Sequence, residues 1–211
     1  MLSGLLERSK IPQGVTHIAG SPNSGKTTLL YQLCRNLSKR KKALIFDCEM
    51  SFSAQRLQEI IKRRDELKKI IIIRIENKKQ QFLNIMKLHN FLINNTFHFI
   101  GVNGFTNHFR FTEITENEIA IHRKLAMQMA YLVKISHLFK QPIILTNQIS
   151  IYKENDKHQF KSVAGQIINH YSNTNIALQH INKKLWKASK EDEEIYYTLT
   201  SNGIEVIFPK L

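Results

Sequence analysis

The sequence of 211 residues contains few of the residues that mark disulfide-rich or disordered proteins. It has only two cysteines, four prolines and eight glycines. Cys34 and Cys48 cannot build a metal site by themselves, and we expect free thiols in a reducing compartment. Because 42% of the residues are hydrophobic while proline and glycine are scarce, the composition indicates a compact globule rather than a disordered chain.

Long apolar runs are also missing. The first residues contain no apolar stretch of the length of a signal peptide, and no later stretch approaches the ~18 apolar residues of a membrane span. We therefore expect a cytoplasmic protein without a membrane partner. The length fits a single α/β domain over residues 1–211.

Acidic residues are few relative to basic ones. The chain has 17 Asp and Glu against 31 Lys and Arg, which gives a net charge of +14. A surplus of that size favours a polyanionic partner, with nucleic acid ahead of an anionic membrane surface. A lysine-rich solvated surface is the alternative that the composition leaves open.

One stretch contains a complete motif that matches G-x-x-x-x-G-K-[ST] and lies between a short apolar segment and a helical pattern. A glycine-rich turn at a helix N-terminus directs backbone N–H groups and the positive end of the helix dipole towards one point, where phosphates bind. We expect Lys26 to reach the β- and γ-phosphates and the Thr27 hydroxyl to bind Mg²⁺. The predicted nucleotide-binding residues are Gly20, Ser21, Pro22, Asn23, Ser24, Gly25, Lys26, Thr27 and Thr28.

Apolar segments that alternate with helical patterns predict an α/β fold. We expect parallel strands at 16–19, 43–47, 70–75, 97–102 and 143–146, and helices at 26–38, 53–65, 80–93 and 115–139. The polar stretch 150–166 has little periodicity and predicts a long loop. Further strands are predicted at 175–181, 185–189, 195–200 and 204–208. The prediction is a twisted, mostly parallel sheet flanked by helices, with antiparallel strands at its C-terminal edge.

Four further segments narrow the choice among proteins with this phosphate-binding motif. Asp47-Cys48-Glu49 with residues 52–57 is similar to D-T-E-G-x-F-x-P-E-R-L, and residues 145–149 are similar to T-N-Q-V. Lys140-Gln141-Pro142 and residues 200–204 match R-Q-P and I-T-D-x-G-I less closely. Over nearly its whole length the chain resembles the ATPase core of RecA-type recombinases, and among them the short archaeal RadB-type paralogues of the RadA strand-exchange protein.

The resemblance implies a RecA-like core that binds ATP and Mg²⁺, with catalytic roles for Lys26, Glu49 and Gln148. Glu49 would be the general base that activates the attacking water, and Arg56 would stack its guanidinium on adenine. Gln148 would report the γ-phosphate to a DNA-binding loop. The alternatives are an exposed acid before a helix for Glu49 and a turn residue for Gln148.

The chain also departs from the family pattern. When Arg110 is aligned with the arginine of D-S-I-T-A-L-x-R, Asn103 falls where the family has the Walker B aspartate that holds the Mg²⁺ shell. An amide keeps the hydrogen-bonding shape but lacks the negative charge, so we expect Thr27 and Asn103 to hold Mg²⁺ weakly and hydrolysis to be slow. The C-terminal K-H-R-S-x-P-E-G signature is eroded, and Lys187 is left as a candidate contact to a neighbour's nucleotide.

By resemblance, DNA would contact two segments. One is 105–115, with Phe109 and Arg110, and the other is 150–166, with Lys153, Lys157 and Lys161. Basic residues interleaved with aromatic ones neutralise phosphates and stack on single-stranded bases, at ~1–3 kcal/mol per stacked base. Polar loops in a basic protein are the alternative.

The combined expectation is an ATP-binding and DNA-binding accessory protein of homologous recombination and DNA repair, with weak ATP hydrolysis. Because Ser3 lies close to the core, the N-terminal helical DNA-binding domain of full-length recombinases is not expected. The partners would be single-stranded DNA and either a RadA-type recombinase or further copies of the chain. Two alternatives remain, a non-catalytic mediator subunit with ATP as a structural ligand and a signalling ATPase of the circadian-clock type.

Overall fold

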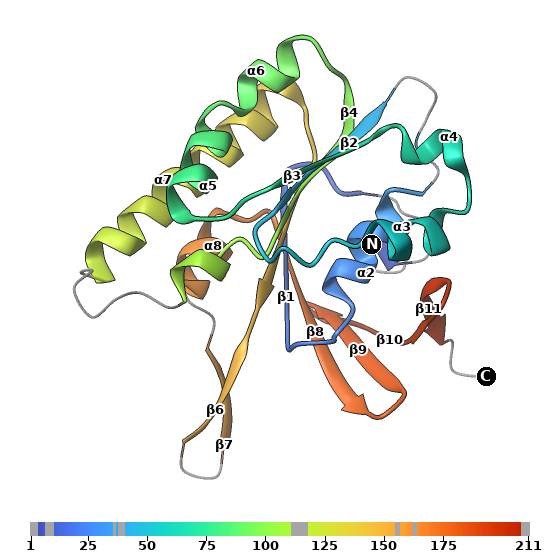
Figure 1. Ribbon diagram of the computed structural model, residues 1–211. Coiled ribbons are helices and arrows are strands. Elements are labelled where there is room, and N and C mark those ends of the chain that lie inside the picture. The colour runs from blue at the N-terminus through green and yellow to red at the C-terminus, as the bar shows by residue number, and fades with distance from the viewer. Residues whose placement is uncertain are drawn as a thin grey trace.

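The computed structural model describes residues 4–6, 11–35, 37, 41–110, 118–154, 157–161 and 164–207. Within these ranges one nine-stranded sheet runs through the molecule in the order β11-β10-β9-β8-β1-β5-β4-β2-β3, with helices on both faces (Figure 1). No helix of the described part has the length and apolarity needed to cross a bilayer.

The strands and helices are bounded as follows. The strands are β1 (Val15–Gly20), β2 (Lys42–Asp47), β3 (Ile70–Arg74), β4 (Phe97–Asn103), β5 (Ile143–Gln148), β6 (Ser150–Glu154), β7 (Lys157–Lys161), β8 (Thr174–Asn182), β9 (Leu185–Lys190), β10 (Glu193–Thr200) and β11 (Gly203–Ile207). The helices are α2 (Lys26–Leu33), α3 (Ala54–Ile61), α4 (Arg64–Leu67), α5 (Lys78–Met86), α6 (Leu88–Ile93), the 3₁₀ turn η1 (Asn107–Phe109), α7 (Glu118–Phe139) and α8 (Gly165–Tyr171).

The central part of the sheet is parallel. β1 pairs in parallel with β5 and β8, and β4 joins β5 to β2, which in turn pairs with β3. β9, β10 and β11 continue the sheet from β8 in antiparallel pairs. The predicted mostly parallel sheet with antiparallel C-terminal strands is therefore confirmed. Parallel pairing also places the C-terminal ends of β1, β2, β4 and β5 at one edge.

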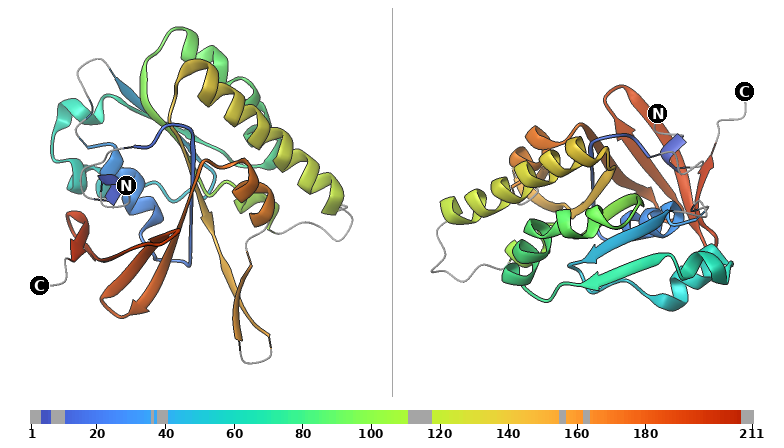
Figure 2. Two further views of the ribbon diagram at one scale, coloured as in Figure 1. Left: turned by 180° about the vertical axis from the view of Figure 1, so that it is seen from behind. Right: turned by 90° about the horizontal axis from the view of Figure 1, so that it is seen from above.

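Figure 2 shows helices on both faces of the sheet. The sheet separates two hydrophobic cores. Along β2, Ala43 and Ile45 pack into the core beneath α2 and α3, whereas Leu44 and Phe46 pack into the core beneath α5, α6, α7 and α8. Successive side chains of a strand point to opposite faces, so a strand covered on both faces must be apolar throughout. The continuous apolar run in β2 has this cause.

The predicted strands agree with the observed ones, and the largest difference in the parallel part is two residues, at the end of β5 (146 predicted, Gln148 observed). Cys34 and Cys48 are free and buried, and burial raises the pKa of both thiols. The predicted end of the last strand, residue 208, lies outside the described residues. Strand positions could be predicted because short apolar runs between turn residues are distinctive.

Three helix boundaries were predicted wrongly. The segment 53–65 is two helices, because Lys62 ends α3 in the left-handed conformation with φ 61°. The segment 80–93 is also two helices, α5 and α6, which meet at Lys87. α2 ends at Leu33, although Leu37 still packs into the core from outside the helix. The apolar spacing continues to Leu37 after α2 and across Lys87 between α5 and α6, so periodicity does not detect these two helix ends, whereas residues 62–66 after α3 are all charged and give no periodicity. The predicted start at 115 lies outside the described residues.

The prediction of a long loop at 150–166 was also wrong. β6 and β7 form an antiparallel hairpin in a two-stranded sheet of their own, with Tyr152 opposite Gln159, and α8 begins at Gly165. The hairpin projects away from the main sheet (Figure 1). A hairpin that stands apart from a core is held by backbone hydrogen bonds, so it does not require the apolar alternation on which strand prediction relies.

One buried histidine ties β1 to its neighbours. His17 Nδ1 lies 2.9 Å from Asn169 Oδ1 in α8 and 3.3 Å from Asn175 Oδ1 in β8. Burial lowers the pKa of His17, and the two hydrogen bonds only partly oppose that effect. Because the unfolded chain binds a proton at a higher pH, near about 6.5, the folded state loses stability as the pH falls through that range.

We expect the thermal unfolding midpoint to fall between pH 7 and pH 5, and we expect His17→Gln to lessen that decline, because glutamine does not take up a proton. Thermal melts across this pH range measure both. His122→Gln, at an exposed position of α7, is the matched control and should melt like the original chain. An equal decline in the His17→Gln variant and the original chain would refute the assignment.

Candidate nucleotide-binding site

The loop between β1 and α2 encloses the side chain of Lys26. Lys26 Nζ donates hydrogen bonds to the carbonyl oxygens of Gly20 at 2.9 Å and Ser21 at 2.7 Å. Gly25 turns the chain into α2 with φ 89°, a left-handed value that side chains rarely adopt, and a Cβ there would lie 2.8 Å from Leu199. No side chain of the described residues caps α2, so the N–H groups of its first turn can bind an anion.

All of the predicted phosphate-binding residues, 20–28, lie in this loop and the first turn of α2. Burial lowers the pKa of Lys26 to about 8; the charge of Glu49 raises this pKa and the charge of Arg110 lowers it further. Three charged side chains from separate parts of the chain thus act on one another at the loop. An anionic phosphate placed among them would favour the charged form of Lys26.

Asn103, at the end of β4, connects several parts of the site. Its Oδ1 accepts a hydrogen bond from Thr146 Oγ1 at 2.9 Å and lies 3.4 Å from Thr27 Oγ1. Its Nδ2 donates to Asp47 Oδ1 at 3.0 Å and to Ser51 Oγ at 2.9 Å. The residue is fully buried. The amide therefore accepts from two threonine hydroxyls at its oxygen and donates to a carboxylate and a serine hydroxyl oxygen at its nitrogen.

Glu49 follows β2 and faces Gly104. A Cβ at position 104, where φ is 73°, would collide with the Glu49 side chain, so the glutamate occupies space that only glycine leaves open. Glu49 Oε1 is buried and has no hydrogen-bond partner within the part of the chain that the structure describes. A carboxylate oxygen in this condition can accept a proton from a water molecule, as a general base does.

Gln148, at the end of β5, is bound by Arg110. Arg110 Nη1 donates to Gln148 Oε1 at 2.7 Å, and Nη2 donates to the Gln148 carbonyl oxygen at 3.0 Å. Burial lowers the pKa of Arg110, and Glu49 partly opposes this. The structure therefore brings Arg110, predicted as a DNA contact, together with Lys26, Glu49 and Gln148.

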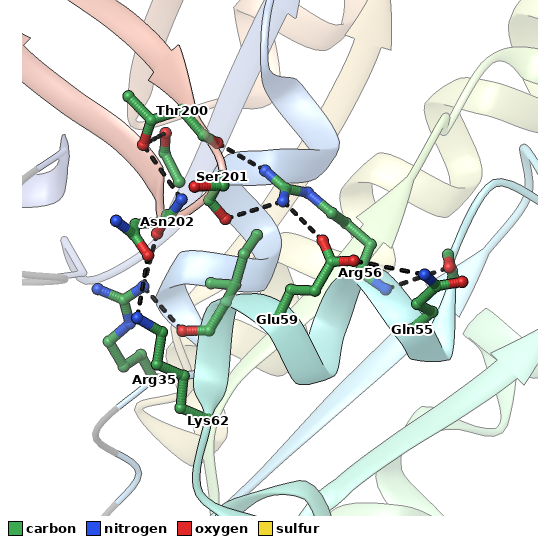
Figure 3. Close-up of polar contacts among 11 residues, drawn as sticks. Arg35, Gln55, Arg56, Glu59, Lys62, Thr200, Ser201 and Asn202 are labelled. Carbon is green, nitrogen blue, oxygen red and sulfur yellow. Dashed lines mark hydrogen bonds and ion pairs between the residues drawn. The ribbon is translucent and has the colours of Figure 1, made fainter.

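Arg56 lies at the turn between β10 and β11, as Figure 3 shows. Arg56 Nη2 donates to the Thr200 carbonyl oxygen at 2.7 Å, and Nη1 donates to the Ser201 carbonyl oxygen at 2.8 Å and to Glu59 Oε2 at 2.9 Å. Hydrogen bonds of a guanidinium lie in its plane, so these three contacts do not themselves block stacking on its faces.

The aromatic part of the first predicted DNA segment was wrong. Phe105 and Phe109 are buried in the core beneath α5 and α7, so they offer no face to a base. Asn107 Nδ2 donates to the Cys48 carbonyl oxygen at 2.9 Å, and His108 Nε2 donates to the Ile75 carbonyl oxygen at 2.9 Å. In a sequence, aromatic side chains beside a basic residue are compatible with either a hydrophobic core or a DNA-binding surface. Here both phenylalanines belong to the hydrophobic core. Residues 111–115 lie outside the described residues.

The second predicted DNA segment is the hairpin of β6 and β7. Its register places Lys153 opposite His158, Lys157 opposite Glu154 and Lys161 opposite Ser150. Because β6 begins two residues after Gln148, the hairpin is connected directly to the edge of the sheet where the phosphate loop lies. Lys187, the remaining candidate from the C-terminal region, donates to Glu194 at 2.7 Å.

Sequence reasoning missed three residues that hold the site together. Thr146 Oγ1 accepts a hydrogen bond from the Gly104 N–H at 2.9 Å besides contacting Asn103. Ser51 contacts Asn103, as described above. The Tyr197 hydroxyl in β10 donates to the Ser24 carbonyl oxygen at 2.7 Å and joins the C-terminal strands to the phosphate loop. The alternation in β10 could have predicted that Tyr197 is buried, but nothing in the sequence indicates its partner.

The oxygen atoms at Thr27 and Asn103 fit a magnesium ion. Mg²⁺ binds oxygen ligands, usually one or two from the protein together with water and substrate phosphates. The Thr27 hydroxyl and Asn103 Oδ1 already lie 3.4 Å apart beside the phosphate loop. The donor set suits the ion, although neither of these two ligands carries a negative charge.

Comparisons with known proteins cover almost the whole chain. The model of the Rad51 family matches residues 1–206. The chain is 26% identical over 200 residues to the DNA repair and recombination protein RadB of Archaeoglobus fulgidus, which covers 90% of this chain and 88% of the relative. It is 25% identical over 222 residues to the RadB of Methanococcus maripaludis, with 98% of each chain covered.

A plant protein is similar as well. The chain is 26% identical over 231 residues to the DNA repair protein RAD51 homolog A of Zea mays, which covers 96% of this chain and 68% of the plant protein. The phosphate loop, the mostly parallel sheet and these similarities agree with one another. The chain therefore belongs to the Rad51 family, and within it resembles the RadB-type members.

Proposed function

We propose that this protein is an ATP-binding and DNA-binding accessory factor of homologous recombination and DNA repair that hydrolyses ATP slowly. One observation carries the proposal. In a chain of the Rad51 family, a complete phosphate loop surrounds Lys26, and the strand-end residue nearest the Thr27 hydroxyl is the neutral Asn103. The names of the relatives, which are DNA repair and recombination proteins, support the process.

ATP binding would rest on residues at the two ends of the nucleotide. The N–H groups of the phosphate loop and Lys26 would hold the phosphates, and the guanidinium faces of Arg56 would receive the adenine. When bound, Mg²⁺ would neutralise phosphate charge, and Thr27 and Asn103 would supply oxygen ligands. Glu49, with its buried and unpartnered Oε1 among the described residues, would hold the attacking water and accept its proton.

The hydrogen bonds of Asn103 are the reason to expect slow hydrolysis. Its amide is satisfied by Thr146, Ser51 and Asp47 without a cation. A carboxylate at this position would face Asp47 and would need a cation to offset the repulsion. The same observation favours the second candidate function, a mediator subunit that uses ATP as a structural ligand. The hydrogen bonds of Asn103 hold this part of the site together without a metal ion, so its structure does not depend on ATP hydrolysis.

DNA binding is supported by the net charge and by the hairpin. The chain carries a surplus of 14 positive charges, and the hairpin with Lys153, Lys157 and Lys161 begins two residues after Gln148. We propose that single-stranded DNA binds there and that nucleotide state reaches it through Gln148. A recombinase of the RadA type or another copy of the chain would be the protein partner.

Lys26→Ala should weaken ATP binding by about 10- to 100-fold, because a charged hydrogen-bond donor to phosphate is lost. Fluorescent-ATP titration and phosphate-release assays measure binding and turnover. Lys79→Ala, at an exposed lysine of α5, is the matched control and should change neither. ATP turnover that survives in Lys26→Ala would rule out hydrolysis at this site.

Asn103→Asp should lower the melting temperature in the absence of Mg²⁺, because the new carboxylate would stand where Nδ2 now donates to Asp47 at 3.0 Å. Mg²⁺ with ATP should restore much of the loss and turnover should rise, since the variant gains an anionic metal ligand. Asn90→Asp, at an exposed position, is the control for added charge. Unchanged melting and turnover would show that the metal is held elsewhere.

Single-stranded DNA binding should weaken steeply with salt, and a triple Lys-to-Ala variant at 153, 157 and 161 should lower the slope of log K against log salt by about 2, at about 0.7 for each phosphate contact. Fluorescence anisotropy across salt, with and without ATP, measures this. The matched control is a triple Lys-to-Ala variant at the exposed lysines 79, 87 and 134. Equal slopes in the two triple variants would contradict a hairpin site.

A further inference from the structure

The contact between Arg110 and Gln148 determines which atoms of Gln148 remain for a ligand. Arg110 Nη1 occupies the side-chain oxygen of Gln148 at 2.7 Å, and Nη2 occupies its main-chain oxygen at 3.0 Å. Because one end of the amide accepts from Arg110, the other end, Nε2, is presented for donation. Donors are what a phosphate oxygen requires, so this orientation suits an anion rather than a cation.

The main chain of Gln148 lies beside the phosphate loop. Gln148 pairs with Gly20 in the parallel register of β1 and β5, and the Ile149 N–H donates to the Gly20 carbonyl oxygen at 3.1 Å. Gly20 is the first residue of the phosphate loop and a hydrogen-bond acceptor for Lys26. Gln148 is therefore one strand spacing from the start of the loop.

Arg110 also contributes positive charge close to Lys26 of the phosphate loop. Its positive charge disfavours the charged form of Lys26, and Glu49 favours the charged forms of both Arg110 and Lys26. The two cations therefore repel each other, and Glu49 interacts favourably with both. A phosphate group entering this region would relieve the repulsion, because it would interact favourably with both cations.

The local structure fixes Arg110 in place. It follows η1, in which Phe109 is buried, and the side chains of Asn107 and His108 bond to the main chain after β2 and β3. Arg110 is partly buried, and its guanidinium uses both terminal nitrogens on Gln148. A residue held in this way is preorganised for a ligand inside the site, whereas contact with a DNA backbone requires an exposed guanidinium.

We propose that Arg110 is a positioning residue for the terminal phosphate of a nucleoside triphosphate: it orients Gln148 so that the amide nitrogen donates to the γ-phosphate, and it does not contact DNA directly. This rests on the proposed ATP binding. Because Arg110 also holds the main chain of Gln148 immediately before β6, the same contact connects the γ-phosphate to the base of the hairpin. The site then distinguishes ATP from ADP through Arg110 and Gln148.

The test compares the affinities of the chain for AMP-PNP and for ADP, each with Mg²⁺, by titration calorimetry. We expect Arg110→Ala to reduce the preference for AMP-PNP over ADP by about 10-fold, the size of a lost charge-assisted contact, and to leave ADP affinity within about twofold. Arg110→Lys should not restore the preference, because one ammonium group cannot reproduce two parallel bonds. Arg74→Ala, at an exposed arginine at the end of β3, is the matched control.

A double-mutant cycle tests whether Arg110 acts through Gln148. Gln148→Ala should reduce the same preference, and the variant with both changes should show no further reduction. The salt dependence of single-stranded DNA binding without nucleotide should be the same in Arg110→Ala and the original chain. Melting temperatures show whether each variant folds. If Arg110→Ala does not fold, the nucleotide preference is measured with Arg110→Lys instead.

Two results would overturn the inference and leave the proposed function standing. One is an unchanged preference for AMP-PNP in Arg110→Ala, and the other is a salt slope for DNA that falls by about 0.7 in that variant without nucleotide, as direct phosphate contact requires. Failure of the original chain to bind either nucleotide, with Lys26→Ala no different, would instead refute the proposed function, and with it this inference.

Discussion

Parallel pairing of β1, β2, β4 and β5 is the constraint on which the site depends, because it places the C-terminal ends of these strands at one edge. Gly20, Asp47, Asn103 and Gln148 each lie at the end of one of these strands. The register places Asp47 beside Asn103 and Gly20 beside Gln148. Groups from residues 20 to 148 thereby come within hydrogen-bonding reach, and both hydrophobic cores serve to hold these strands together.

The side-chain amide of Asn103 connects the polar groups at that edge of the sheet. Asn103 accepts from hydroxyl groups at one end and donates to the Asp47 carboxylate at the other, so its surroundings are satisfied without a cation. A carboxylate in this position would make the stability of the site depend on a metal ion. In the proposed function, the neutral residue removes that dependence and would lower the affinity for the metal ion, whereas the contacts within the phosphate loop come from Lys26 and the main chain.

Arg110 links the two parts of the proposed function. Through Gln148 it contacts the strand that borders the phosphate loop, and the chain runs from Gln148 into the hairpin of β6 and β7. Because the guanidinium bonds to both the side chain and the main chain of Gln148, a change at either end moves the same residue. The proposed coupling of nucleotide and DNA through these two residues would need no large rearrangement.

The sequence by itself determined the phosphate loop, the strand positions, the sheet class and the family, because these depend on local patterns: a contiguous motif and short apolar runs. It did not show that Lys62 and Lys87 interrupt two helices, that residues 150–154 and 157–161 pair as antiparallel strands, or that Phe105 and Phe109 are buried. Only the tertiary structure decided the partners of Asn103 and Arg110. Those partners lie 38 to 76 residues away along the chain, and which polar groups meet depends on strand register and packing rather than on any property of neighbouring residues.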